Sequence, residues 1–215
     1  MVKIKIIKDG PYLVSGKLPI NEDIVQYDQE GTPLNTDKGK ILSNDEECAL
    51  CRCGESANKP FCDGSHKMTN FDGTENLENQ KNNEDQTETI EGPDLILRDT
   101  PNLCAGAGFC HRAGGVWELT RNSDNVEAKK IAVEECHCCT SGRLIAVDKK
   151  TGKDLEKKLE ASIGIPDGGP LCVKGDVEII SADGKSYPKR NKVTLCRCGK
   201  SANKPFCDGN HLDSF

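Results

Sequence analysis

Three cysteines and a histidine recur at one fixed spacing in two stretches of the sequence. The stretch LCRCGESANKPFCDGSH covers residues 50–66, LCRCGKSANKPFCDGNH covers residues 195–211, and only two positions differ between them. Each copy has the spacing C-x-C-x8-C-x3-H. A C-x-C turn can place two thiolates on one metal ion, and a Cys and a His four residues apart can share one helical face and bind a second position. The candidate ligands are Cys51, Cys53, Cys62, His66, Cys196, Cys198, Cys207 and His211.

The composition favours metal over disulfides as the use of these cysteines. The chain has 215 residues, is 35% hydrophobic and 4% aromatic, and contains 13 cysteines, so its apolar cores must be small and metal binding can support them. The N-terminal VKIKIIK lacks the apolar core of a secretory signal, and no run approaches a membrane span. We therefore expect a cytoplasmic protein, in whose reducing compartment clustered cysteines bind metal. The net charge of -6 predicts no nucleic-acid partner.

The longer pattern around the ligands resembles a known family. A Cys3His set is also an ordinary set of tetrahedral zinc ligands, so the spacing alone leaves zinc open. The fuller pattern C-x-C-x2-S-x3-P-x-C-D-G-S-H, which residues 51–66 match, resembles the CDGSH iron–sulfur family. That resemblance implies a [2Fe–2S] cluster in each copy, with the C-x-C pair on one iron and the Cys and His on the other. Asn210 replaces the usual small residue before the last histidine, which predicts changed hydrogen bonding rather than a lost cluster.

The duplication extends beyond the cysteines. DGPYLVSGKLPI at residues 9–20 is echoed by DGGPLCVKGDVEI at residues 167–179, so each unit is predicted to combine a β-cap of short paired strands around a Gly-Pro turn with a cluster loop. We assign residues 1–75 and 163–215 to these two units. The first has about fourteen extra residues between cap and motif, around QYDQEGTPLNTDKGK, which we predict to be a loop. Residues 76–92 are polar and acidic and are predicted to form a linker.

Residues 93–162 predict a different, small α+β domain. The apolar runs DLILR (94–98), VWELT (116–120) and RLIAV (143–147) suit strands. A helix is expected from about residue 125 to 135, capped by Asp124 with Glu127 and using Val126, Ala128, Ile131 and Ala132 as its apolar face, with the cysteines in loops. The fold class expected for the whole chain is α+β, small and β-rich, with two CDGSH units flanking this insert.

The cysteines of the middle domain suggest a further cluster. Ferredoxins use C-x2-C-x2-C and a remote cysteine, commonly followed by Pro. Here only the first and third cysteines of C-x2-C-x2-C are present, as Cys104 and Cys110. Cys139 fits the remote position, with Thr140 in place of Pro. This resembles the divergent single-cluster ferredoxin domains found fused to CDGSH motifs, and implies [3Fe–4S], or [4Fe–4S] with one outside ligand. The open choices for that ligand are Cys136, Cys138, His111 and His137, and a domain that binds zinc or no metal also stays open.

These patterns predict a multi-cluster iron–sulfur protein that acts in electron transfer, cluster transfer or redox sensing, with redox or cluster-transfer proteins as partners. The alternative is a zinc-bound interaction scaffold using the same Cys3His sites. An enzyme is not expected, because the sequence has no flavin or nicotinamide fingerprint, nucleophile elbow or P-loop. Family members often pair two CDGSH units as homodimers. That resemblance implies that this chain, which has two units, is a monomer with an internal pseudo-dimer.

Overall fold

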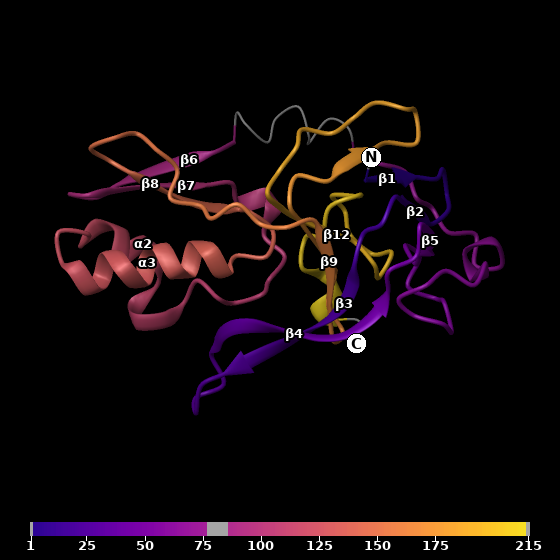
Figure 1. Ribbon diagram of the computed structural model, residues 1–215, viewed down its shortest axis with the longest axis horizontal. Helices are drawn as coiled ribbons and strands as arrows, with labels where there is room; N and C mark the ends of the chain where they lie inside the picture. The colour runs from indigo at the N-terminus through magenta and orange to yellow at the C-terminus, as the bar shows by residue number, and fades with distance from the viewer. Residues whose placement is uncertain (1, 77–85, 214–215) are drawn as a thin grey trace.

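Two sheets, each built from strands of both cysteine-motif units, form one part of the molecule, and a separate three-stranded sheet with two helices forms the other (Figure 1). The computed structural model describes residues 2–76 and 86–213. The β-rich α+β fold class predicted from the sequence is confirmed. Within the described residues, no helix has the length and apolar content needed to cross a membrane.

The two units exchange strands. The first sheet has the order β11 (Glu178–Ile180), β1 (Lys3–Ile6), β2 (Tyr12–Ser15), β5 (Glu47–Leu50). The second has the order β12 (Lys192–Leu195), β10 (Leu171–Lys174), β9 (Ser162–Pro166), β3 (Ile20–Tyr27), β4 (Pro33–Ser43). The parallel pairs β1–β11 and β3–β9 each join a strand of one unit to a strand of the other, and all other pairs are antiparallel. Neither sheet is therefore complete without both halves of the chain.

The predicted strand pairs around the Gly-Pro turns are present in both caps. In the first, β1 and β2 pair antiparallel and Ile7 N–H donates to Pro11 O at 3.1 Å. In the second, β9 and β10 pair in the same way. The alternation in β1 buries Ile4 and Ile6 and exposes Lys3 and Lys5, as a half-buried strand requires.

One hydrophobic core serves both units. Its buried members come from the first cap, from the second cap and from the cluster loops, and each such side chain contributes about 1.5–3 kcal/mol when fully buried. Leu103 of the middle domain belongs to the same core and is 1% exposed. Representative members are Ile4, Tyr12, Leu50, Ile163, Val193 and Phe206.

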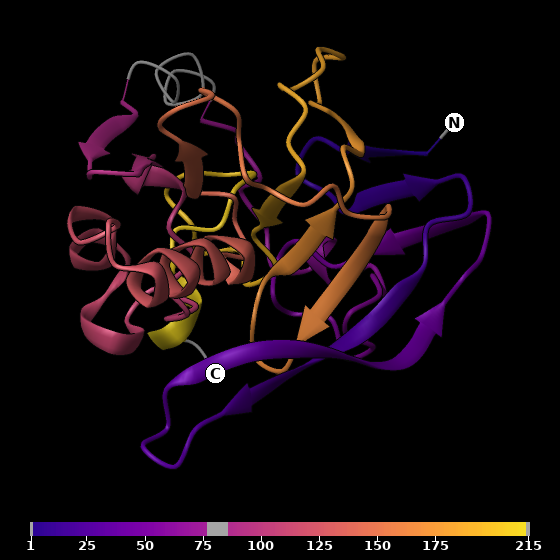
Figure 2. The same ribbon diagram turned by 60° about the vertical axis from the view of Figure 1, so that its left-hand side comes forward.

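The loop predicted for the extra residues of the first unit is instead a hairpin. Strands β3 and β4 pair antiparallel through a turn in which the Asp28 carboxylate accepts the N–H groups of Glu30 and Thr32 at 2.9 and 2.8 Å. Most of β4 is exposed or half-buried, so the sequence has no apolar alternation there to reveal a strand. The hairpin extends toward the helices of the middle domain (Figures 1 and 2).

The middle domain consists of β6 (Glu88–Glu91), β7 (Leu95–Asp99) and β8 (Leu144–Asp148), with α2 (Val116–Arg121) and α3 (Val126–Cys138) against one face of that sheet. The strands predicted at 94–98 and 143–147 correspond to β7 and β8. Strand β6 lies inside the range predicted as linker, and it is part of the sheet because it pairs along β7 and Ile90 packs on the core. Residues 77–85 of that range lie outside the described residues.

The helices correct four further expectations. The run 116–120 is helical, because Val116, Leu119 and Thr120 are buried at helical spacing and Leu119 N–H donates to Gly115 O at 3.0 Å. Helix α3 is capped by the side chain of Asn125, rather than Asp124. Val126 is 82% exposed and is not part of the apolar face. Cys136 and Cys138 lie in α3 and not in a loop.

Candidate metal centres

Each cysteine motif places its four donors in two pairs. In the first unit, Cys51 Sγ lies 3.8 Å from Cys53 Sγ, and Cys62 Sγ lies 3.4 Å from His66 Nδ1. In the second unit, the corresponding distances are 3.7 Å for Cys196 and Cys198 and 3.2 Å for Cys207 and His211. The structure thus brings together all eight ligands predicted in the two motifs, as four donor pairs.

The pair distances fit a tetrahedral metal ion. Two thiolates at about 2.3 Å from a tetrahedral ion lie about 3.8 Å apart, and replacing one sulfur by a histidine nitrogen shortens that edge. In the part of the chain that the structure describes, no three His, Cys, Asp or Glu side chains converge to bind a single metal ion. The four short donor distances define two pairs in each motif, which suits a centre with two metal ions and two ligands on each.

The same backbone frame positions both sets of donors. Cys51 N–H donates to Pro60 O and Cys196 N–H to Pro205 O, each at 2.8 Å, so the C-x-C turn is tied to the segment that carries the third cysteine. The hydroxyls of Ser56 and Ser201 bridge the same loops by donating to Phe61 O at 2.6 Å and to Phe206 O at 2.7 Å.

Burial differs between the two sites. Cys207 and His211 are only 2% and 7% exposed, whereas Cys62 and His66 are half-buried. Burial raises the pKa of the Cys207 thiol to about 12. Burial, followed by the nearby Arg197 guanidinium, lowers the pKa of His211, which favours the neutral imidazole that a metal ion requires. A buried thiol of this kind is deprotonated readily only when a positive ion binds it.

Family profiles agree with the motifs. The profile described as "Iron-binding zinc finger CDGSH type" matches residues 9–67 and 168–212, and "Divergent 4Fe-4S mono-cluster" matches residues 90–149. No curated protein and no solved structure matches the chain significantly.

The chain is a fusion of two CDGSH segments with a divergent 4Fe–4S domain.

In this iron–sulfur protein no cysteine is tied up in a disulfide, since all thirteen are free thiols. The first CDGSH segment also supports the second site, because the Tyr12 hydroxyl donates to Cys196 O at 2.8 Å and to Pro205 O at 3.1 Å. The equivalent cap residue of the second segment is Leu171, which has no hydroxyl. The cap of the first segment therefore donates hydrogen bonds to the loop of the second site, and the equivalent residue of the second cap has no hydroxyl with which to do the same for the first site.

The CDGSH aspartates organise the turn before the last ligand. Asp63 accepts Ala57 N–H at 2.8 Å and the Ser65 hydroxyl at 2.7 Å, and these hydrogen bonds lower its pKa strongly. Asp208 accepts Ala202 N–H at 2.8 Å and the Asn210 amide at 3.1 Å. Asn210 also donates to Lys200 O at 3.3 Å, so it changes the hydrogen bonds of this turn while Cys207 and His211 remain paired.

Two buried arginines between the paired cysteines were not predicted as site residues. Arg52 is 2% exposed, donates to Ile7 O at 3.1 Å and to Gly73 O, and its guanidinium stacks over Tyr12 at 5.6 Å. Arg197 is 6% exposed and donates to Gly169 O at 2.9 Å. Burial lowers the pKa of Arg197, and the thiolates of Cys51 and Cys198 oppose that shift. The sequence signal was the C-R-C triplet, present in both motifs.

The predicted ligands of the middle domain come from three segments. Cys104 follows the short 3-10 helix Pro101–Leu103, Cys110 precedes another at Arg112–Gly114, and Cys139 follows the last residue of α3. Burial, followed by the thiolates of Cys139 and Cys104, raises the pKa of Cys110 to about 11. Cys110 and Cys139 both pack against the core of the middle domain.

A buried charged network lies beside these thiols and was also not predicted. Arg143 donates to Asp99 at 2.6 and 2.8 Å and stacks over Trp117 at 5.4 Å, while Trp117 Nε1 donates to Asp99 at 2.9 Å. Hydrogen bonding to Asp99 raises the pKa of Arg143, and Cys104 adds to that effect. The network places a fixed positive charge next to Cys104.

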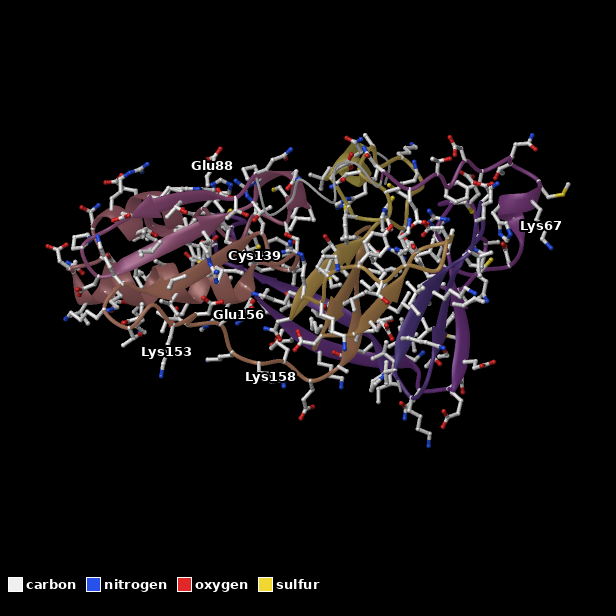
Figure 3. The ribbon with its side chains drawn as sticks, turned by 90° about the horizontal axis from the view of Figure 1, so that it is seen from above. Lys67, Glu88, Cys139, Lys153, Glu156 and Lys158 are labelled. Carbon is white, nitrogen blue, oxygen red and sulfur yellow. The ribbon has the colours of Figure 1, made fainter. Side chains whose placement is uncertain are left out.

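The Cys104–Cys110 loop covers the second CDGSH site. Asn203 donates to Asn102 O at 2.9 Å, and the backbone of Gly106 lies so close to Leu212 that a Cβ there would be 2.8 Å from it. His211 lines a cavity of about 170 Å³ together with residues 105–107. Cys104 is near enough to raise the pKa of Cys207. In Figure 3, Cys139 lies at the end of the middle domain that faces the CDGSH sheets, and Lys67, next to His66, lies at the far end of the molecule.

Proposed function

We propose that this protein is an electron carrier with two [2Fe–2S] clusters and a third, ferredoxin-type cluster, in which electrons pass between the middle domain and the second CDGSH site. When bound, each cluster supplies one-electron redox chemistry. The observation that carries the proposal is the contact of the Cys104–Cys110 loop with the loop that bears Cys207 and His211. Leu103, immediately before Cys104, anchors that loop in the core shared by both CDGSH segments.

The paired donors support the two [2Fe–2S] assignments. Two protein ligands per ion leave two tetrahedral positions on each iron, which bridging sulfides can fill. The three predicted thiol ligands of the middle domain suit [3Fe–4S] or [4Fe–4S] in the same way.

The geometry favours electron transfer over cluster delivery at the second site. Cluster delivery needs ligands that a recipient protein can reach, yet Cys196, Cys198 and Cys207 are each at most 7% exposed, and the Cys104–Cys110 loop lies beside His211. An electron needs no such access. The half-buried His66 at the far end makes the first site the exposed end of the series, where a redox protein partner would dock. We infer a carrier rather than an enzyme, in a reducing compartment such as the cytoplasm.

Electron paramagnetic resonance of the fully reduced protein tests this proposal. Unpaired electrons on adjacent clusters split and broaden each other's signals. We expect this interaction between the middle and second clusters in the parent chain and in Cys62→Ala, which disables only the first site. Cys207→Ala should leave the middle cluster with an unsplit signal. The proposed series would be wrong if Cys207→Ala gave the same split middle-domain signal as Cys62→Ala.

Metal analysis of the same preparations tests the cluster content. Iron should reach at least about four atoms per chain from the two CDGSH sites alone, with matching acid-labile sulfide. About two zinc ions per chain without labile sulfide would instead indicate the zinc scaffold.

A further inference from the structure

Four side chains near the middle-domain thiols could complete its ligand set, and three of them are engaged elsewhere. His137 Nε2 lies 2.8 Å from Leu155 O. Cys138 Sγ donates to Leu34 O of strand β4 at 3.4 Å. His111 is exposed and packs on the Trp117 ring at 5.8 Å between centroids.

Cys136 is the exception. It is 3% exposed, and it belongs to the middle-domain core against which Cys110 and Cys139 both pack. Cys136 and Cys139 are three residues apart at the end of α3, and Cys139 N–H donates to Cys136 O at 3.3 Å. Residues at this helical spacing lie on one face, so both side chains are directed to the same region.

The end of α3 is fixed by a lysine of the second CDGSH segment. Lys192 is 4% exposed, and its ammonium donates to Cys136 O at 2.8 Å and to His137 O at 3.2 Å while pairing with Glu156 at 3.0 Å. This contact satisfies carbonyls at the helix C-terminus and fixes the direction of the last turn. The position of Cys136 is thereby coupled to strand β12, which leads directly into the ligand Cys196.

We infer that Cys136 is the fourth ligand of the middle-domain cluster and that, with Cys104, Cys110 and Cys139, it holds a [4Fe–4S] cluster by four thiolates. Residues 136–139 then form a C-x2-C pair, a spacing that ferredoxins use for such clusters. The Cys104–Cys110 loop supplies the other two ligands. The inference deepens the proposed function, since it rests on a cluster being present in this domain. A buried cysteine can also act as a small apolar residue of the core, so the experiment must distinguish a packing role of Cys136 from ligation.

The experiment compares Cys136→Ala and Cys136→Ser with Cys138→Ala in the full chain, purified without oxygen. With four thiolates, the parent and Cys138→Ala should contain about eight iron atoms per chain and show no resonance signal when oxidised. With only three thiolates, mild oxidation by ferricyanide removes one electron from the [4Fe–4S]²⁺ cluster and releases one Fe²⁺. A paramagnetic [3Fe–4S]⁺ cluster is left. Both Cys136 variants should therefore show that signal and retain about seven iron atoms.

The outcomes distinguish a failure of this inference from a failure of the proposed function. If the parent and the Cys136 variants all keep about eight iron atoms and show no resonance signal after ferricyanide, Cys136 is a core residue. The inference then fails while the proposed function stands. The inference also fails alone if the parent already shows the [3Fe–4S]⁺ signal. A parent with only about four iron atoms has no middle cluster, and both proposals fail. Because serine retains nearly the volume of cysteine, loss of iron in Cys136→Ser reflects a lost ligand, provided that the CDGSH absorption is unchanged.

Discussion

Gly54 of the first CDGSH segment packs directly against the carbonyl of Cys198 in the second. A Cβ on Gly54 would lie 2.4 Å from Cys198 O, and the reciprocal contact of Gly199 with Cys53 O is 2.5 Å. Gly54 also has a φ of +84°, which disfavours any other residue. The two C-x-C turns therefore meet backbone to backbone.

Gly54→Ala should destabilise both CDGSH sites together. The clash with backbone and the positive φ predict a loss of about 3 kcal/mol or more in the free energy of unfolding, because neither turn can move without displacing its ligands. Gly31→Ala is the matched control: its φ is +82° and no atom lies within 4 Å of the added Cβ, so it should lose only about 1 kcal/mol. Urea unfolding followed by circular dichroism measures both. Equal losses in the two variants would show that the contact between the turns is unimportant.

The exchange of β3 and β11 predicts the oligomeric state. Because each CDGSH segment completes its sheet with a strand of the other, the chain should sediment as a monomer of 23.4 kDa at all concentrations tested. Analytical ultracentrifugation over a hundredfold range of concentration is the measurement. A dimer that does not dissociate on dilution would mean that the strands are exchanged between chains instead.

Acid should release the first cluster before the second. A histidine binds metal only through an unprotonated nitrogen, and His66 is half-buried whereas His211 is 7% exposed. The pKa of His211 is lowered by burial and by Arg197, so its contribution to stability is complete above the free value of about 6.5 and is lost as pH falls through the lower folded value. Absorbance followed from about pH 8 to about pH 5 should show two bleaching steps. Bleaching of the second site first would contradict this order.

Replacing either histidine by cysteine should make its site more resistant to acid. His66→Cys should remove the early bleaching step and His211→Cys the late one, because a thiolate adds negative charge that binds iron more firmly. The added charge should also shift the corresponding reduction potential downward. Potentials measured in parallel are the second readout. If neither variant changed the bleaching or the potentials, histidine would not be a ligand.

Arg197 should raise the reduction potentials of both CDGSH sites. It is buried near Cys51 of one site and Cys198 of the other, and its positive charge favours the more negative reduced state. Arg197→Gln should lower both potentials, on the order of tens of millivolts. Lys200→Gln removes a positive charge from an exposed position in the same loop and should change the two potentials much less. Unchanged potentials in Arg197→Gln would show that the guanidinium does not act on the clusters.

The sequence predicted the donor pairs and the strand pairs of the two caps because both depend on local pattern, whereas the β3–β4 hairpin was predicted as a loop. The spacing of Cys51, Cys53, Cys62 and His66 identifies a metal site without knowledge of the fold, and a Gly-Pro turn between alternating residues predicts a strand pair. The strand partners were not predictable, since alternation in β3 indicates which face is buried but not which strand lies alongside. Arg52 was missed because a charged residue in a short motif is usually solvated, and only the three-dimensional structure shows that it is buried.

In the middle domain, too, local sequence pattern predicts some elements but not how they pack. Its strands β7 and β8 follow from apolar runs, but the run 116–120 satisfies both a strand and a short helix, and packing of Val116 and Leu119 decides between them. The thiols of the domain were found one by one from spacing. The position of Cys136 at the C-terminal end of α3 depends on Lys192, more than fifty residues away in sequence, whose ammonium donates to Cys136 O.

The β3–β4 hairpin and the middle domain each occur once, so the fused pair of CDGSH segments has lost the equivalence that two identical chains would keep. In a symmetric pair, an added electron has no preferred position. Here one site is enclosed by the Cys104–Cys110 loop and supported by Tyr12, while the other is open near His66. Clusters in unequal surroundings have unequal potentials. Under the proposed function, joining the two segments in one chain therefore gives their clusters different reduction potentials, so that an added electron occupies one site in preference to the other.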